Sequence, residues 1–264
     1  MGVNHTTVLR RISIVESVVG SSPFERREGK YLATKQGLAL VAAAEKMEDA
    51  QFEAARKIEA LGDEISGPIS VSMPETLSQY FLAADIGEFI ARYPNVDLSL
   101  HSSIDFVDLD RADADVVIRI SNNPPEHLIG RKLFKYDRSF YGSKSYLRKI
   151  STGEQAARWL GWTSDSNQPE WIRNSPYPDA PIALRIDRPL DRHIAAVHGL
   201  GLIFEACFLA DQEPELVQLD GAMREPDRDI WVLTHPDLKD SPKVTALRQH
   251  LVAALLNKSN LMQE

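Results

Sequence analysis

The chain has 264 residues, of which 43% are hydrophobic and 26% are charged, values that are ordinary for a globular protein. The longest purely apolar run, Leu38 to Ala44, is too short to span a bilayer, and the polar N-terminus does not resemble a signal peptide. A single cysteine, Cys207, excludes an internal disulfide and fits a reducing compartment. We therefore expect a cytoplasmic protein that makes no contact with a membrane.

The net charge of −8 argues against a protein that coats nucleic acid, but the charge is unevenly distributed. Residues 1–37 carry six basic and three acidic side chains, a net charge of +3, so the remainder of the chain carries −11. A small basic segment on a large acidic body suggests that only this segment could meet phosphate.

The first 37 residues have the pattern of a helix followed by a wing. Asn4 is a favourable N-cap and Gly20 a favourable stop, so a helix is predicted over 5–19. Its apolar face is formed by residues at helical spacing, namely Val8, Ile12, Val15 and Val19. The stretch FERREGKYLATKQG follows, with Gly29 at the centre of a basic, turn-like loop. This stretch predicts a two-stranded wing.

A long helix is predicted next, because the chain from about Lys35 to Leu61 contains no proline and is rich in alanine. Two series of residues seven apart run along it, Leu40, Met47, Ala54 and Leu61 in the first and Ala44, Gln51 and Ile58 in the second. This spacing is typical of the seam of a coiled coil, and a solvated surface helix is the alternative. The residues Ser66-Gly67-Pro68 interrupt the helical pattern. A linker and dimerisation helix is therefore predicted over 38–65.

The chain after Pro68 has an α/β pattern. Strands are predicted in ISVSM, VDLSLH, ADVVIRIS, PIALRI, LGLIFEA and RDIWVLTH, and extended crossover segments in LIGRKLFKYDRSFYGS. Helices are predicted over 74–93, 145–150, 189–199 and 244–256. The two sets of alternating elements predict two subdomains with one hinge. Subdomain I takes about 66–136 and 236–264, and subdomain II takes about 137–235.

Together these stretches resemble the LysR-type transcriptional regulators. That family reads V-S-Q-P-T-V-S-R-R-I-x-x-L-E-x-x-L-G along its recognition helix, then L-F-x-R and L-T-x-x-G. Here VNHTTVLRRISIVESVVG, PFERR and YLATKQG fall in that order at that spacing, and blocks such as FIARYPNVDLSL and AAVHGLGLIFEACFLAD continue the match. The resemblance implies an α/β chain with a partial winged helix-turn-helix over 1–37, a long linker helix, and a two-subdomain effector domain like a periplasmic binding protein over 66–264.

The sequence departs from the family pattern at several positions. Leu9 stands where the family usually has a DNA-facing serine, Pro23 and Ala33 replace leucines, and Ala206 replaces a common proline. The family also has a first helix and a scaffold helix before the point where this sequence starts. We therefore expect the chain as written to bind DNA poorly, and a version extended upstream to bind it well.

A DNA-binding role is implied by the resemblance for the polar side of the first helix, where His5, Thr6, Thr7, Arg10 and Arg11 lie. Arginine can contact phosphate or the edge of guanine, and histidine and threonine can contact groove edges. The alternative is that these are solvated side chains on a surface helix.

An effector-binding site is predicted beyond the carboxyl ends of the strands, where open α/β sheets bind ligands. This rule selects Pro74, Thr76, Ser102, Ser103, Ile120, Ser121, Thr163 and Phe204. Their hydroxyl groups suit a carboxylate, which makes a small organic acid one candidate effector. Glu75 would oppose an anion unless it points away, and the alternative is that these are ordinary loop and cap residues.

No catalytic residue, metal site or cofactor is predicted. The aspartate-rich stretch DFVDLDRADAD lacks the glycine and terminal glutamate of a calcium loop, and GLGLIFE follows a helix rather than the strand that a dinucleotide fingerprint requires. His193 and His198 are five apart, no G-x-S-x-G turn occurs, and Cys207 lies in an apolar stretch. The leading hypothesis is a ligand-responsive, DNA-binding regulator that forms a homodimer or homotetramer. The alternative is a small-molecule-binding or interaction module whose DNA-binding head is inactive.

Overall fold

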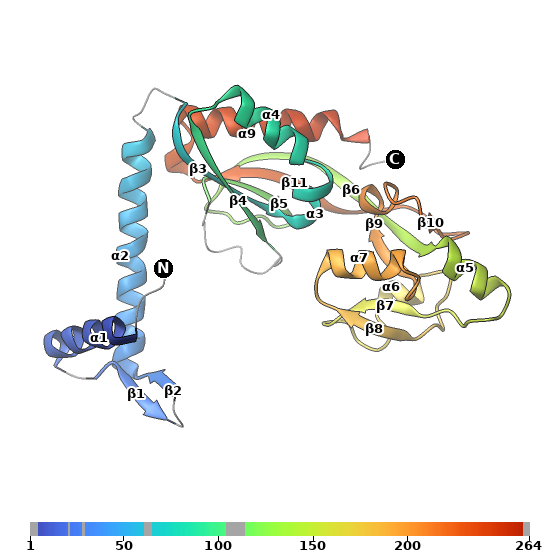
Figure 1. The fold of residues 1–264 in the computed structure, drawn as a ribbon, viewed down its shortest axis with the longest axis horizontal. Coiled ribbons are helices and arrows are strands. Elements are labelled where there is room, and N and C mark those ends of the chain that lie inside the picture. Colours follow the sequence, from blue (N-terminus) through green and yellow to red (C-terminus); the bar gives the residue numbers. More distant parts are fainter. Residues whose placement is uncertain (1–4, 21, 28–29, 61–64, 104–113, 261–264) are drawn as a thin grey trace. The chain divides into compact units, whose positions relative to one another are not determined.

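The computed structural model describes residues 5–20, 22–27, 30–60, 65–103 and 114–260 (Figure 1). The chain divides into two compact units, unit 1 over Met1–Glu59 and unit 2 over Ala60–Glu264. Among the helices of the described residues, none has both the length and the apolar character needed to cross a membrane.

Unit 1 contains the helix and the wing that the sequence predicts. Its elements are α1 (His5–Val19), β1 (Phe24–Arg27), β2 (Lys30–Ala33) and most of α2 (Lys35–Ala60). The two strands pair antiparallel, with Phe24 opposite Ala33. On α1, Ile12 and Val15 are half-buried, whereas Ile14 and Val18 are exposed. The apolar side chains of α1 are therefore only partly covered within unit 1.

The wing and α2 meet closely at Gly37. The Thr34 hydroxyl lies 3.2 Å from the Pro23 carbonyl oxygen, to which it donates, and accepts a hydrogen bond from the Gly37 N–H at 3.1 Å. A Cβ atom on residue 37 would lie 1.9 Å from the Pro23 carbonyl oxygen. Only glycine permits this approach, which explains Gly37. The two hydrogen bonds of the threonine hydroxyl explain Thr34.

Helix α2 carries exposed apolar side chains along its first half. Leu38, Val41 and Met47 are 61%, 41% and 75% exposed. The helix begins at Lys35 and ends at Ala60, whereas the sequence predicts a helix over 38–65. Leu61 and the three residues after it lie outside the described residues.

Unit 2 is built on one seven-stranded sheet with the order β10-β6-β11-β5-β3-β4, in which β9 also pairs with β6. Strand β3 (Gly67–Pro74) runs parallel to β4 (Val96–Ser103) and to β5 (Val116–Ile120). Strand β11 (Glu225–Thr234) pairs antiparallel with β5 and with β6 (Ile129–Ser143). Strands β9 (Ile203–Ala206) and β10 (Leu216–Gln218) pair antiparallel with the later part of β6.

The first half of unit 2 consists of β3, β4, β5 and the helices that cover them. These are α3 (Glu75–Tyr80), α4 (Ala83–Arg92), the short 3-10 helix η1 (Pro236–Leu238) and α9 (Pro242–Asn257). Helices α4 and α9 lie together over one face of the sheet (Figure 1). Their apolar sides close a core in which Val71, Ile118, Val232, Leu247 and Leu251 are fully buried.

The single helix predicted over 74–93 is interrupted. The N–H groups of Phe81 and Leu82 both donate to the Leu77 carbonyl, which ends α3, and α4 starts at Ala83. Phe81 and Leu82 are 4% and 0% exposed. A continuous helix would carry these consecutive residues about 100° apart, whereas the turn directs both into the core.

The second half of unit 2 lies between the two long strands in the sequence. It contains α5 (Lys144–Ser151), the parallel pair β7 (Trp159–Trp162) and β8 (Ile182–Ile186), α6 (Glu170–Arg173), α7 (Pro189–Val197) and α8 (Cys207–Ala210), with β9 and β10. Figure 1 shows β6 passing from the first half into the second. The boundary expected near residue 136 lies inside this 15-residue strand, so the two halves share one continuous sheet.

A fragment of residues 65–264 should fold alone, because the apolar core of unit 2 is formed within it. It should unfold in a single cooperative transition in urea. Leu251→Ala, at a side chain that is 0% exposed on α9, should lower the free energy of unfolding by about 2–5 kcal/mol. Leu256→Ala, on the same helix but 37% exposed, is the matched control and should cost about 1 kcal/mol or less. An insoluble or non-cooperative fragment would show that the boundary is wrong.

Candidate functional site

The carboxyl ends of β3, β4 and β5 meet at one edge of the sheet, because the three strands run parallel. In the register of β3 and β4, Pro74 lies beside Ser103 and Met73 beside Ser102. Thr76 is buried in α3, which follows β3 directly. The Ser102 hydroxyl is exposed and lies 3.4 Å from the hydroxyl of Ser78.

Strand β5 brings two further predicted residues to this edge. Ile120 is buried, and Ser121 follows it, half-buried and fixed to β11. The Ser121 N–H donates to the Asp229 carbonyl at 2.9 Å, and the Trp231 indole donates to the Ser121 carbonyl at 2.9 Å. Six of the eight predicted effector residues thus belong to one strand edge, although the side chain of Ser103 lies outside the described residues.

The other two predicted effector residues belong to the second half. Thr163 is exposed directly after β7. Phe204, on β9, is half-buried and stacks on Phe140 with ring centroids 4.6 Å apart. These two residues do not share the strand edge that collects the other six.

The predicted DNA-binding residues all lie on α1. Arg10 and Arg11 are exposed near its middle. His5, Thr6 and Thr7 belong to the first turns of the helix, but their side chains lie outside the described part of the structure.

A carboxylate–guanidinium pair joins the two halves of unit 2. Glu75 is the first residue of α3, and Arg188 directly precedes α7. The Arg188 Nη2 donates to the Glu75 Oε2 at 2.8 Å, and this hydrogen bond raises the pKa of Arg188. A second contact joins the same helices, because the Tyr80 ring meets the His193 ring edge to face at 6.0 Å. The strand edge that holds the predicted effector residues therefore also carries an acid, Glu75, whose charge the protein itself neutralises.

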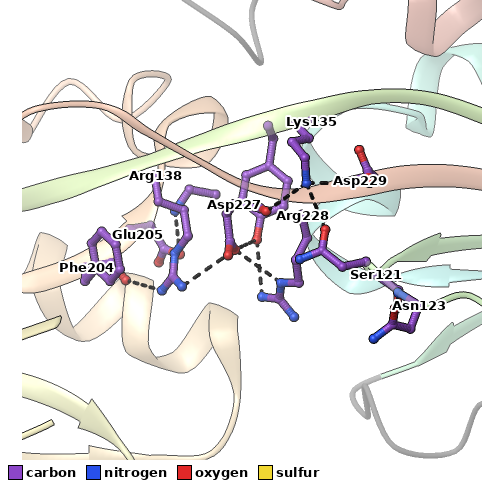
Figure 2. A network of polar contacts seen from close by, with 12 residues as sticks. Ser121, Asn123, Lys135, Arg138, Phe204, Glu205, Asp227, Arg228 and Asp229 are labelled. Carbon is purple, nitrogen blue, oxygen red and sulfur yellow. Dashed lines mark hydrogen bonds and ion pairs between the residues drawn. The ribbon is translucent and has the colours of Figure 1, made fainter. Parts of the chain in front are cut away.

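One turn after Arg188, Arg192 is enclosed within the second half. Its side chain is 1% exposed and its guanidinium lies 3.6 Å from the centroid of the Trp162 ring. Its Nη2 donates to the Phe204 carbonyl at 2.9 Å. The Arg138 Nη2 donates to the same oxygen at 3.0 Å, and Figure 2 shows this contact between Arg138 and Phe204. Burial lowers the pKa of Arg192 to about 10, so it stays charged at neutral pH beside Glu205, which is 3.7 Å away.

A network of charges occupies β6 and β11, the strands that connect the halves (Figure 2). The Tyr136 hydroxyl donates to the Asp227 carboxylate at 2.5 Å, and Arg138 and Arg228 lie 3.6 and 3.2 Å from it. Although burial opposes ionisation, the Arg138 charge and the Tyr136 hydrogen bond hold the pKa of Asp227 below its usual value. The register of β11 shifts on either side of Asp229. Bulges of this kind change the direction in which the side chains of a strand point.

The charged groups of this region can hold a ligand through hydrogen bonds and ion pairs. Burial raises the pKa of Cys207 to about 11, so its thiol remains protonated at neutral pH. No group of three or more potential metal-ligating side chains occurs among the described residues. What the region offers is a set of guanidinium and carboxylate groups beside aromatic rings.

The sequence reading missed the charged residues of the second half. Arg188 and Arg192 are four apart at the start of a predicted helix and so lie on one side of it. That spacing was the available signal. Arg138, Glu205 and Asp227 come from separate strands, and no local pattern links them.

Lowering the pH should destabilise unit 2 partly through His193. Burial lowers the pKa of His193 below its ordinary 6.5, so the folded protein keeps the ring neutral where the unfolded chain protonates it. The unfolded state then binds more protons below about pH 6.5, and stability falls as the pH falls. The loss can reach about 1.4 kcal/mol per pH unit between the two pKa values.

Urea unfolding at several pH values, followed by tryptophan fluorescence, measures this effect because all four tryptophans lie in unit 2. His193→Gln should flatten the decline of stability below about pH 6.5. His101→Gln, at an exposed position on β4, should leave it unchanged. Identical slopes for His193→Gln and the unchanged chain would assign the effect to other groups.

Comparison with known proteins places unit 2 in a family. A family profile described as the LysR substrate binding domain matches residues 62–256. An HTH-type transcriptional regulator of Xanthomonas campestris is 26% identical over 149 residues, 56% of this chain and 43% of that protein. The regulator CrgA of Neisseria meningitidis is 22% identical over 222 residues, 81% of this chain and 74% of that protein.

The fold of the whole chain is also found in a solved structure. It is the full-length structure of the Vibrio cholerae virulence activator AphB, described as a member of the LTTR protein family. The match covers 95% of this chain and 90% of the AphB chain. The TM-score is 0.62 at 19% sequence identity, a likeness of fold. Because the family profile spans most of the chain and coincides with unit 2, the chain belongs to the LysR-type transcriptional regulator family.

Proposed function

We propose that the protein is a ligand-responsive, DNA-binding transcriptional regulator that works in the cytoplasm. The observation that carries this proposal is the order of parts in one chain. A helix with exposed arginines and a wing precede a long helix and a LysR substrate binding domain. In this proposal unit 2 binds a small molecule and the α1 helix of unit 1 contacts DNA.

The effector is proposed to bind where the edge formed by β3, β4 and β5 faces the second half. Thr76, Ser102 and Ser121 offer hydroxyl groups from the first half. Phe204 and Trp162 offer aromatic surface from the second, with Arg138 and Arg192 against those rings. Such a combination of apolar walls and a few polar groups suits a small polar molecule.

An inactive DNA-binding head is the second candidate, and the sequence of α1 favours it in one respect. Leu9 offers no hydrogen bond at a position that faces DNA in the family. In that case the protein would be a small-molecule-binding or interaction module.

DNA binding should depend on Arg10 and Arg11. Each contact with a phosphate releases counterions, so Arg10→Ala and Arg11→Ala should each reduce the slope of log K against log salt by about 1. Fluorescence anisotropy on the promoter region of the gene, at several stated salt concentrations, measures that slope. Arg92→Ala, at an exposed position on α4 in unit 2, is the matched control and should leave it unchanged.

Absence of sequence-specific binding by the 264-residue chain in this titration would favour the interaction module over the regulator.

A homodimer is proposed to form through α2, with a tetramer as the larger alternative. The exposed Leu38, Val41 and Met47 support it, because an isolated helix leaves these apolar side chains in water. Leu40→Asp with Met47→Asp places two charges in the predicted seam and should yield monomers in sedimentation velocity. Lys46→Asp, beside the seam at an exposed position, should leave the mass unchanged. An unchanged mass in the double variant would refute the seam.

A further inference from the structure

The contact between Glu75 and Arg188 links two segments that are 113 residues apart in the sequence. Its two sides differ in burial. The side chain of Glu75 is 6% exposed, whereas that of Arg188 is 43% exposed. The second carboxylate oxygen of Glu75, Oε1, is buried and has no hydrogen-bond partner among the described residues.

A buried carboxylate requires a partner, because removing a charge from water is costly unless an opposite charge compensates. Arg188 supplies that partner from the other half of unit 2. Its Nε also lies 3.9 Å from Asp191, but that contact stays within the start of α7. The bond to Glu75 is thus the interaction of Arg188 that spans the halves.

We propose that Glu75 is a built-in acidic ligand of Arg188, which clasps the two halves of unit 2 together before an effector binds and excludes acidic groups from Arg188. An acid could reach this guanidinium only by displacing Glu75. Displacement would leave a carboxylate that is almost wholly buried without a counter-charge.

The exclusion has a consequence for the effector, and this part rests on the proposed function. A group that reaches Glu75 without opening the clasp must donate a hydrogen bond to the free Oε1 atom. Amino, amide and hydroxyl groups can do so, whereas a carboxylate cannot. At this point of the site the effector is therefore a hydrogen-bond donor, and the organic acid suggested by the nearby hydroxyl groups does not fit.

The clasp can be tested without effector or DNA. Spin labels at Glu88→Cys on α4 and Lys149→Cys on α5, both exposed, report the distance between the halves in the full chain. Cys207 is fully buried and stays in place. Dilution with unlabelled protein removes distances between copies. Glu75→Gln and Arg188→Gln should each lengthen and broaden the distance distribution, whereas Arg188→Lys, which keeps the charge, should preserve most of it.

Asp191→Asn is the matched control, because it neutralises an acid beside the same arginine without touching the contact between halves. It should leave the distribution unchanged. A distribution in Glu75→Gln that equals that of the unchanged chain would overturn the clasp and leave the proposed regulator function untouched.

The exclusion of acids is tested by adding succinate to the protein. Its binding is measured as a shift in the thermal midpoint of unit 2, followed by tryptophan fluorescence. In Glu75→Gln the guanidinium of Arg188 is released, so succinate should bind at least about tenfold more tightly than to the unchanged chain, or about 1.4 kcal/mol. The gain should disappear in Glu75→Gln with Arg188→Gln. Equal responses of the unchanged chain and Glu75→Gln, including no response in either, would overturn the exclusion.

Discussion

The pairing of β6 with β11 is the constraint on which unit 2 depends. Both strands run through the first half, and the later part of β6 then holds β9 and β10 of the second. Hydrogen bonds along these strands fix the halves to one sheet, so a relative movement of the halves must bend or twist the same two strands. The register shifts of β11 lie in that stretch, where the ladder between the strands is interrupted.

The pairing of β6 with β9 and β11 brings charged side chains together where the two halves meet. A continuous strand carries its side chains alternately to the two faces of the sheet. Asp227 and Arg138 enter the network from β11 and β6, and Glu205 from β9 beside them. The three buried acids of the described residues, Glu75, Glu205 and Asp229, each lie within 4 Å of a basic side chain, which is the condition for keeping such groups charged away from water. Under the proposed function, a charged effector would exchange partners with the protein's own side chains at this junction.

Much of the fold could be predicted, because its signals are local. Apolar spacing and turn residues in the sequence predict helix α1, the wing and most strands of unit 2. The break at Phe81 could not be predicted, since the apolar spacing of residues 74–93 is also that of one helix, and only the packing of two neighbouring side chains decides against it. The elements α6, α8 and β10 are three or four residues long, too short for any periodic pattern.

The candidate site likewise contains residues that the sequence predicts and residues that only the fold identifies. Residues after the strands of the first half could be collected by a topological rule, since parallel strands share one end. The charged residues of the second half could not, because Arg138, Arg188 and Glu205 meet their partners only through pairings between distant segments. Glu75 is an example of a residue whose position is predictable but whose partner is not. The sequence predicts its position after β3 and its conflict with an anion, but its partner Arg188 lies 113 residues away in the sequence and is identified only by the fold.

The place of Glu75 also bears on how an effector could influence the rest of the chain. Glu75 directly follows β3, and the other end of β3 begins at Gly67, close to the start of unit 2. The intervening strand is firmly held, because Ile69, Val71 and Met73 are buried and β4 and β5 pair with it on both sides. A change of partner at Glu75 therefore acts on one end of a rigid strand whose opposite end leads toward α2. The shortest covalent path from the proposed effector site to unit 1 runs through β3, while the longer strands β6 and β11 set how far the halves can part.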